Sequence, residues 1–239
     1  FGAQIAPYDP MVNHADAIGQ APNNIYFLGT DGLGRDILSR LLTGANRTLG
    51  FSALSTLIAI FIGAGLGMNA PMLGKWGDGF LVLVMNTLLA FPPLFTALII
   101  LTLLGRGDMA LILAVGVGQV GMTAQVIRGA TYSILAEEYI TSARALGAGW
   151  WRIVRVHIRR GILPTLGAQM GIVFGYCLFN SAALNFLGLG VALGVPEWGA
   201  MLAEGRAIFR TAPHLALFTG LLLMSVVITV NRLIDDYFA

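Results

Sequence analysis

The stretch EYITSARALGAGWWRIVRVHIRRGILP, Glu138 to Pro164, decides how the rest of the chain is interpreted. It is polar and rich in arginine, yet it lies between two long apolar runs, Met109–Ala130 and Thr165–Leu187. Such a segment is typical of a site where a soluble partner docks on a surface helix. It is equally typical of an amphipathic helix whose arginines contact lipid headgroups. The residues of the stretch alone leave both alternatives open.

The composition is that of a polytopic membrane protein. Of 239 residues, 56% are hydrophobic and only 11% are charged, with a mean hydropathy of +0.78. A soluble domain carries about 25% charged residues, so this chain has too few charges to cover a soluble surface. The net charge of +2 and the absence of other basic blocks give no reason to expect nucleic acid as a partner. With a single cysteine, Cys177, an internal disulfide is excluded.

Five apolar runs are long enough to cross a bilayer, which takes about 20 helical residues. They are Thr48–Asn69, Phe80–Leu104, Met109–Ala130, Pro164–Leu187 and His214–Ile234. The predicted fold class is therefore all-α, a polytopic bundle of membrane helices. Phe91-Pro92-Pro93 predicts a kink in the second span. Gly63 and Gly67, four residues apart in the first span, predict a face for close helix packing.

The regions outside the spans suggest how the chain is oriented. Residues 1–47 are interpreted as an external segment that ends in a surface helix over Asp31–Asn46. Residues 48–239 form the transmembrane domain, and the density of arginine in its loop, about residues 131–163, places that loop on the cytoplasmic side. The chain opens with FGAQIAPYDP, which resembles the outer end of a preceding helix. We therefore expect a sixth, N-terminal span in the intact protein.

Within the loop, the residue pattern predicts a helical hairpin. Thr141–Leu146 favours a short helix, and Gly147-Ala148-Gly149 would end it with a turn. Trp150–Arg160 then resumes a helical pattern. The residues expected together on one face of this second helix are Trp151, Val154 and Ile158.

Near the start of the chain, charged residues recur at helical spacing. Thr30 or Asp31 could cap the helix that follows, because their side-chain oxygens can accept hydrogen bonds from free backbone N–H groups. Asp31 with Arg35, and Asp36 with Arg40, have the spacing of i,i+4 ion pairs. We interpret them as a capped and salt-bridged surface helix.

Polar residues near the expected outer end of the fourth span are the candidates for lining a path. Asn180, Ser181 and Asn185 are costly in lipid, so they should face protein or water. Farther along, Trp198 suits the interfacial belt. Glu197 either contacts an external partner or is solvated.

Six segments, spread in order over the whole chain, resemble the second permease subunit of the peptide/nickel family of ABC importers. They are APYDP (6–10), LGTDGLGRDILSRLLTGAN (28–46), AFPPL (90–94), the arginine-rich loop, NFLGLG (185–190) and PEWGAML (196–202). The loop matches the family's cytoplasmic pattern at Ala143 and Gly147. It departs from that pattern at Arg159-Arg160, where the family usually has Leu-Pro.

The resemblance implies a type I ABC-importer permease fold in a bacterial plasma (inner) membrane. It also implies a homologous second permease, two ATPase subunits and an extracytoplasmic substrate-binding protein as partners, besides the surrounding membrane lipid. The substrate would be a peptide, nickel or a metal chelate, and the departure at Arg159-Arg160 tilts the interpretation toward the last two. The residues that the resemblance assigns to the ATPase-coupling helix are Ala143, Arg144, Ala145, Leu146, Gly147 and Ala148.

No residue pattern predicts catalysis, a cofactor or a metal site. Signatures of P-loop ATPases, zinc proteases and serine hydrolases do not occur in the sequence. His14, His157 and His214 are scattered and do not form a ligand cluster. The alternative function is a self-sufficient channel or secondary transporter. It predicts an internal repeat and ionisable residues inside the spans, and neither is apparent.

Overall fold

The computed structural model describes residues 2–192 and 194–238, and the regular secondary structure of these residues is helical apart from a single isolated bridge between Thr30 and Asp36. The first half comprises α1 (Gly2–Ile5), η1 (Ala15–Ala17), α2 (Ile37–Asn69), η2 (Ala70–Leu73), α3 (Gly74–Ala90), α4 (Pro93–Leu104), α5 (Asp108–Gly118) and α6 (Val120–Leu135). The second half comprises α7 (Glu138–Ala145), α8 (Trp150–Ile153), η3 (Val154–Ile158), α9 (Arg159–Gly161), α10 (Leu163–Phe186), α11 (Trp198–Ala207) and α12 (Pro213–Phe238).

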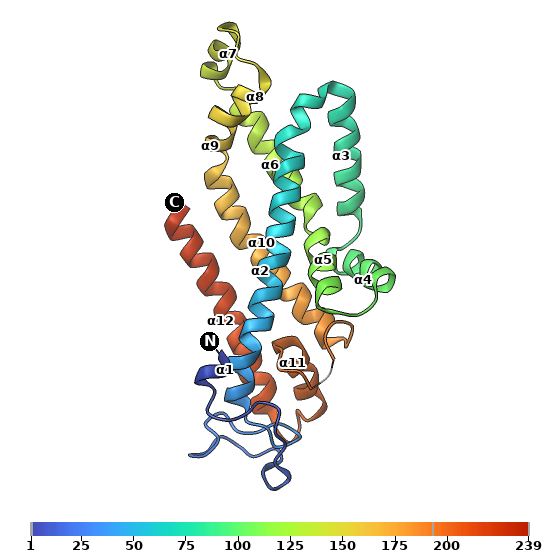
Figure 1. The fold of residues 1–239 in the computed structure, drawn as a ribbon, viewed down its shortest axis with the longest axis vertical. Coiled ribbons are helices and arrows are strands. Elements are labelled where there is room, and N and C mark those ends of the chain that lie inside the picture. The colour runs from blue at the N-terminus through green and yellow to red at the C-terminus, as the bar shows by residue number, and fades with distance from the viewer. Residues whose placement is uncertain (1, 193, 239) are drawn as a thin grey trace.

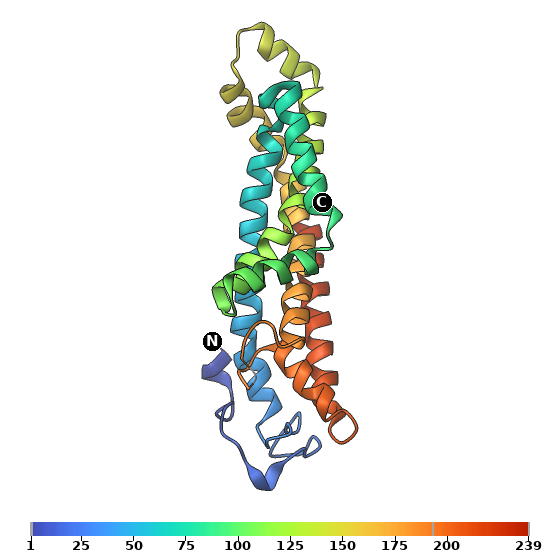
Figure 2. The same cartoon turned by 90° about the vertical axis from the view of Figure 1, so that its right-hand side faces the viewer.

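The molecule is an elongated bundle whose two ends differ. In Figure 1, α7 projects at one end, while the N-terminal segment and α11 lie at the other. Helix α2 runs from one end toward the other and packs chiefly against α6 and α10. The view from the side shows the same separation of the two ends (Figure 2). The arginine-rich loop and the outer motifs therefore occupy opposite ends, as expected for the two sides of a membrane.

Three helical stretches are long and apolar enough to cross a membrane, and a fourth candidate is a pair of helices bent by 60°. The stretches are Ile37–Ala90, Asp108–Leu135 and Pro213–Ile234, and the bent pair is Trp150–Gly161 with Leu163–Phe186. The first stretch contains both α2 and α3, which turn back on each other at η2 (Figure 1). Helix is thus present in all five segments that were predicted to span.

The second predicted span, Phe80–Leu104, is two helices rather than one. Phe91 has an extended backbone, with φ −97° and ψ 130°, and separates α3 from α4. A residue before proline is pushed out of the helical region, and Pro92-Pro93 cannot continue the hydrogen bonds of the preceding helix. The expected kink is confirmed, and it is a complete break.

The separate surface helix predicted over Asp31–Asn46 is wrong. Helix α2 begins at Ile37 and continues for 33 residues, about 50 Å, through residue 47 to Asn69. No proline interrupts it, and its early residues Arg40 and Leu41 are buried. The same helix therefore belongs partly to the outer motif and partly to the first span. The external location of residues 1–47 stays a prediction.

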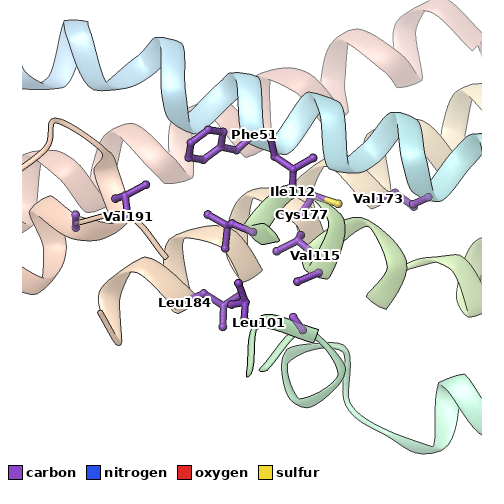
Figure 3. Packing of buried hydrophobic residues seen from close by; sticks show 13 residues of the cluster. Phe51, Leu101, Ile112, Val115, Val173, Cys177, Leu184 and Val191 are labelled. Atoms are coloured by element: carbon purple, nitrogen blue, oxygen red, sulfur yellow. The ribbon is translucent and has the colours of Figure 1, made fainter. Parts of the chain in front are cut away.

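The main apolar core lies where α2, α4, α5 and α10 meet. Phe51 of α2 packs with Ile112 and Val115 of α5 and with Cys177 of α10 (Figure 3). Leu101 brings α4 into the same cluster. Cys177 is fully buried here, in agreement with its interpretation as a structural thiol.

Helices α2 and α6 approach closely because glycine faces the contact. A Cβ atom added to Gly67 would lie 2.6 Å from the carbonyl oxygen of Ala124 and 2.8 Å from the backbone nitrogen of Arg128. At Gly63 the nearest atom, Thr123 Cβ, would be 2.7 Å away. The predicted close-packing face of Gly63 and Gly67 is confirmed.

At the end opposite α7, a largely buried cluster of four charges joins the N-terminal segment to α11. Arg35 Nε lies 2.7 Å from Asp31 Oδ2, and Arg35 Nη2 lies 3.0 Å from Glu204 Oε2. Arg40 is fully buried and pairs with both carboxylates. Burial would raise the pKa of Asp31, but the charge of Arg40 and the backbone N–H groups of Arg35 and Leu33 outweigh it. The pKa of Asp31 therefore lies below its ordinary value.

This cluster confirms one predicted ion pair and corrects another. Asp31 and Arg35 do pair, but Asp36 does not pair with Arg40. Asp36 instead caps α2, accepting a hydrogen bond from the Ser39 backbone N–H at 2.8 Å, so Thr30 and Asp31 are not the cap. The charges are buried between two elements and do not cover a surface helix.

Glu197 and Trp198 are also buried, contrary to both alternatives for Glu197 and to the interfacial role of Trp198. Glu197 is 0% exposed; it caps α11 by accepting from the Ala200 N–H at 2.8 Å, and it accepts from Thr48 Oγ1 at 3.0 Å. Trp198 Nε1 donates to the Leu41 carbonyl at 2.9 Å. Burial is the main cause that raises the pKa of Glu197. These contacts fix α11 against α2.

Gly67→Ala should destabilise the subunit by about 1–3 kcal/mol, because the new methyl group meets backbone atoms that cannot move aside. Gly65→Ala is the matched control, since a Cβ there meets no atom within 4 Å. The control should leave stability unchanged or raise it by about 0.5–1 kcal/mol, as alanine does in a helix. Reversible unfolding in mixed detergent micelles measures both. Equal effects of the two substitutions would contradict the close contact.

The raised pKa of Glu197 predicts a pH-dependent stability. The folded state holds the proton more tightly than the unfolded state, so the contribution is greatest below the ordinary pKa of 4.5 and falls as pH rises above it. From pH 5 to pH 8, the melting temperature of the unsubstituted subunit should fall relative to Glu197→Gln. Asp31 stays ionised across this range in both proteins. Glu138→Gln, at an exposed position, is the control. If the melting temperatures of the unsubstituted subunit and of Glu197→Gln differ by the same amount at every pH from 5 to 8, the pKa of Glu197 is not raised.

Candidate functional site

The projecting loop contains a short helix that ends in a well-defined glycine motif. The backbone N–H of Ala148 donates to the Ala143 carbonyl at 3.0 Å, and that of Gly147 donates to the Arg144 carbonyl at 2.9 Å. These two bonds form a Schellman motif, which requires a left-handed residue after the helix. Gly147 has φ +84° and supplies it. The predicted helix and its glycine stop are both confirmed.

The six residues assigned to the coupling helix are brought together at the tip of the loop (Figure 1). Leu146 is 89% exposed, and Arg144, Ala145 and Gly147 are also exposed. Ala143 and Ala148 are half-buried on the inner side of the turn. The tip therefore presents an apolar side chain at the end of a short helix. Its role in coupling stays a prediction.

Beneath the tip, an isoleucine cluster fastens α7 to the transmembrane helices. Ile140 of α7 is fully buried and belongs to one cluster with Ile153, Ile158 and Ile162. Ile127 of α6 belongs to the same cluster, together with Ala64 of α2. The loop is therefore packed against the transmembrane helices through these buried side chains.

The face predicted for the second loop helix is wrong, because a π-helical turn changes its register. In η3 the Arg159 N–H bonds to the Val154 carbonyl, five residues back. The wider turn buries Ile153 and Ile158 together, although an ordinary α-helix would place them on different sides. Trp151, predicted to lie beside Ile158, is instead 64% exposed.

An ion pair missed by the sequence interpretation holds α3 to α6 near the base of the loop. Arg128 Nε donates to Asp78 Oδ1 at 2.7 Å, and the Tyr132 hydroxyl donates to Asp78 Oδ2 at 2.9 Å. The pair joins residues 50 positions apart. The one signal for this ion pair in the sequence is that an acidic and a basic residue lie at the ends of neighbouring spans.

The candidate path residues are buried within the subunit. Asn180, Ser181 and Asn185 are each less than 9% exposed. Asn185 Oδ1 accepts from the Val191 N–H at 2.8 Å and so holds the segment after α10 in place. A path between two permeases would be lined by side chains exposed on each subunit. The path-lining role of these three residues stays a prediction, and their burial favours a packing role.

The described residues include no group of three or more His, Cys, Asp and Glu side chains that could hold a metal ion. The loop presents an exposed leucine, a helix end and arginines that form no ion pair among the described residues. At the opposite end, ion pairs join the side chains of Asp31, Arg35, Arg40 and Glu204 to one another.

Comparison with known proteins identifies relatives over nearly the whole chain. Residues 57–239 match the family described as "Binding-protein-dependent transport system inner membrane component". The glutathione transport system permease protein GsiD of Pectobacterium atrosepticum is 35% identical over 238 residues, which are 98% of this chain and 79% of that protein. The protein of the same name from Escherichia coli O157:H7 is 35% identical over 241 residues, covering 98% and 78%.

Similar solved structures come from the same kind of transporter. An inward-facing MetNI methionine ABC transporter matches with a TM-score of 0.70 and 20% identity, covering 83% of this chain and 94% of that chain. An amino acid ABC transporter crystallised with histidines matches with a TM-score of 0.66 and 16% identity, covering 83% and 92%. At these identities the likeness shows the fold, and it is the ABC-importer permease fold that the resemblance implied.

The family match covers most of the chain, and its description places the protein in the inner membrane. The two relatives extend the match to nearly every residue, including the outer motifs that precede residue 57. The chain therefore belongs to the family of binding-protein-dependent transport system inner membrane components, as a permease subunit of an ABC importer of the peptide/nickel type.

Proposed function

We propose that this subunit converts ATP binding and hydrolysis on two partner ATPases into opening and closing of a path that it forms with a homologous second permease. The observation that supports this proposal best is the rigid tip of the loop, where Leu146 is 89% exposed on a helix closed by Gly147. A fixed, exposed apolar residue is suited to a groove on a soluble partner.

The packing beneath the tip supports transmission of movement. Ile140 connects α7 to Ile153 and Ile158, and the same cluster reaches Ile127 of α6 and Ala64 of α2. Close-packed side chains do not compress, so a displaced α7 carries these helices with it as a body. Because α2 continues to the opposite end, movement at the loop reaches the contact between α2 and α11.

The partners follow from the family. A permease of a binding-protein-dependent system receives its substrate from an extracytoplasmic binding protein, and we propose such a protein for this chain. The outer end, with the N-terminal segment and α11, is the surface available to it. Helix α12 leaves most of its apolar length exposed in the isolated subunit, so it faces lipid or the second permease.

We further propose that the substrate is a small peptide. The relatives named as glutathione transport permeases share 35% of residues over 98% of this chain. This similarity favours peptide over nickel or a metal chelate, toward which the departure at Arg159-Arg160 had tilted the interpretation. Uptake of labelled glutathione, a second tripeptide and nickel by the reconstituted transporter would separate these substrates; uptake of nickel alone would reject the proposal.

Leu146→Ser should lower the affinity of the permease pair for its ATPases by roughly 30-fold or more, the size of a typical interface hot spot. Gly147→Trp should also lower this affinity, because its bulky side chain would stand at the surface that we propose for the ATPase. In the subunit alone, a Cβ at Gly147 meets no atom within 4 Å, so the substitution costs only backbone strain there. Copurification of the ATPases and the rate of ATP-driven uptake measure the effect.

Gly149→Ala is the matched control for both substitutions. Gly149 lies in the same turn with φ −72°, and a Cβ there meets no atom within 4 Å. The control should keep both ATPase binding and uptake. The docking assignment is wrong if Leu146→Ser and Gly147→Trp copurify with the ATPases and transport as the unsubstituted subunit does.

The purified subunit alone should show no ATP hydrolysis, because we propose that catalysis lies entirely on the partner ATPases. Hydrolysis should appear only when both ATPase subunits are added, and a release assay for inorganic phosphate measures it. Sustained hydrolysis by the subunit without its partners would refute a non-catalytic role. It would favour a self-sufficient transporter instead.

A further inference from the structure

The segment Trp150–Gly161, which we call the arginine segment, carries positive charge that the chain does not neutralise. All four of its arginines are exposed: Arg152, Arg155, Arg159 and Arg160. None of them pairs with a carboxylate in the part of the chain that the structure describes. The arginines Arg35 and Arg40, at the other end, are buried and paired. The charge of the arginine segment is therefore available to a molecule outside the subunit.

The bend after the arginine segment sets its angle to the bilayer. The segment meets α10 at an angle of 60°, at Ile162. A helix α10 that crosses the membrane therefore leaves the segment closer to the membrane plane than to the membrane normal. Its buried isoleucines, Ile153 and Ile158, face the bundle, while the arginines face away from it. The segment is therefore amphipathic, with its apolar side packed on the bundle and its arginines open to molecules outside the subunit.

Two exposed tryptophans indicate that the segment lies at headgroup level. Trp151 is 64% exposed within the segment, and Trp76, near the start of α3, is 91% exposed. Both elements lie at the same end of the molecule in Figures 1 and 2. Tryptophan concentrates at the boundary between hydrocarbon and headgroups, because its ring is apolar and its N–H is polar. Lys75, next to Trp76, adds a further cation at this level.

A cavity of about 510 Å³ adjoins the start of the segment at Trp150 and is not lined by Arg155 or Arg159. It opens between the turn that joins α2 to α3 and the start of the arginine segment. Its lining combines apolar Pro71 and Met72 with Arg144 and Trp150.

We propose that the arginine segment binds the phosphate groups of anionic phospholipids in the adjacent leaflet, with Arg155 and Arg159 as the main contacts. The charge alone would also suit an acidic surface on an ATPase. The angle of the segment and the exposed tryptophans favour lipid, because both place the arginines beside headgroups. The proposal does not depend on which substrate is transported.

Binding of phosphatidylglycerol and phosphatidylcholine to the assembled transporter in detergent tests the proposal, with native mass spectrometry counting the bound lipids. The double variant Arg155→Gln with Arg159→Gln should bind phosphatidylglycerol about 25-fold more weakly, roughly fivefold for each arginine near a headgroup. Its binding of phosphatidylcholine should not change. Arg155→Lys with Arg159→Lys keeps the charge and should retain most of the binding.

The matched control removes two exposed arginines elsewhere, Arg106→Gln with Arg210→Gln, and should keep phosphatidylglycerol affinity within about twofold. Equal affinities of the two double glutamine variants would overturn the proposal. It would also be overturned if inorganic phosphate competed as well as the lipid, or if the Arg155/Arg159 variant lost its ATPases while keeping its lipid. Loss of ATPase binding by Leu146→Ser tests the docking helix separately, so the two proposals fail in distinguishable ways.

Discussion

The architecture of this subunit depends on α2 remaining one unbroken helix. In lipid, every backbone N–H and C=O group must find its partner inside the protein, and a continuous helix does this without outside help. Because α2 is 33 residues long, it contacts the buried charge cluster at one end and the loop cluster at the other. Gly63 and Gly67 then let α6 approach it closely enough to pack backbone against backbone. The remaining helices are arranged around this pair.

The two ends of the molecule use charge in opposite ways. At the outer motifs, Asp31, Arg35 and Arg40 are buried and Glu204 is partly buried, and each charge has a partner, so the cluster is neutral. Such a cluster fixes the position of α11 relative to α2, since breaking one pair would leave the other charge buried alone. At the loop, the arginines have no partner within the described chain and face outward. The charges at one end are thus paired within the subunit, and the arginines of the segment Trp150–Gly161 at the other end are not paired among the described residues.

Sequence alone predicted the helical class, the five apolar segments, the loop helix, its stop at Gly147 and the glycine face of α2. These features depend on local rules of periodicity, propensity and backbone freedom, which a sequence displays directly. The burial of Glu197 and Trp198 was not predictable, because it depends on α11 folding back onto α2, some 150 residues away in the chain. The Arg128–Asp78 pair was not predictable either, because its residues lie 50 positions apart in the chain. The prediction that Trp151 lies on the same face as Ile158 was wrong because the π-turn between them changes the register of the helix, and the residue pattern does not reveal such a turn.

That π-turn separates two properties of the loop that an ordinary helix ties together. An α-helix rotates by about 100° for each residue, so its length fixes the direction in which its last side chains point. A turn of five residues absorbs one extra residue and resets this phase. The tip of the loop can thus lie at a fixed distance while the arginine face points in a direction set independently by the π-turn. An insertion or deletion of one residue between the tip and α10 would therefore change the direction of one surface without moving the other.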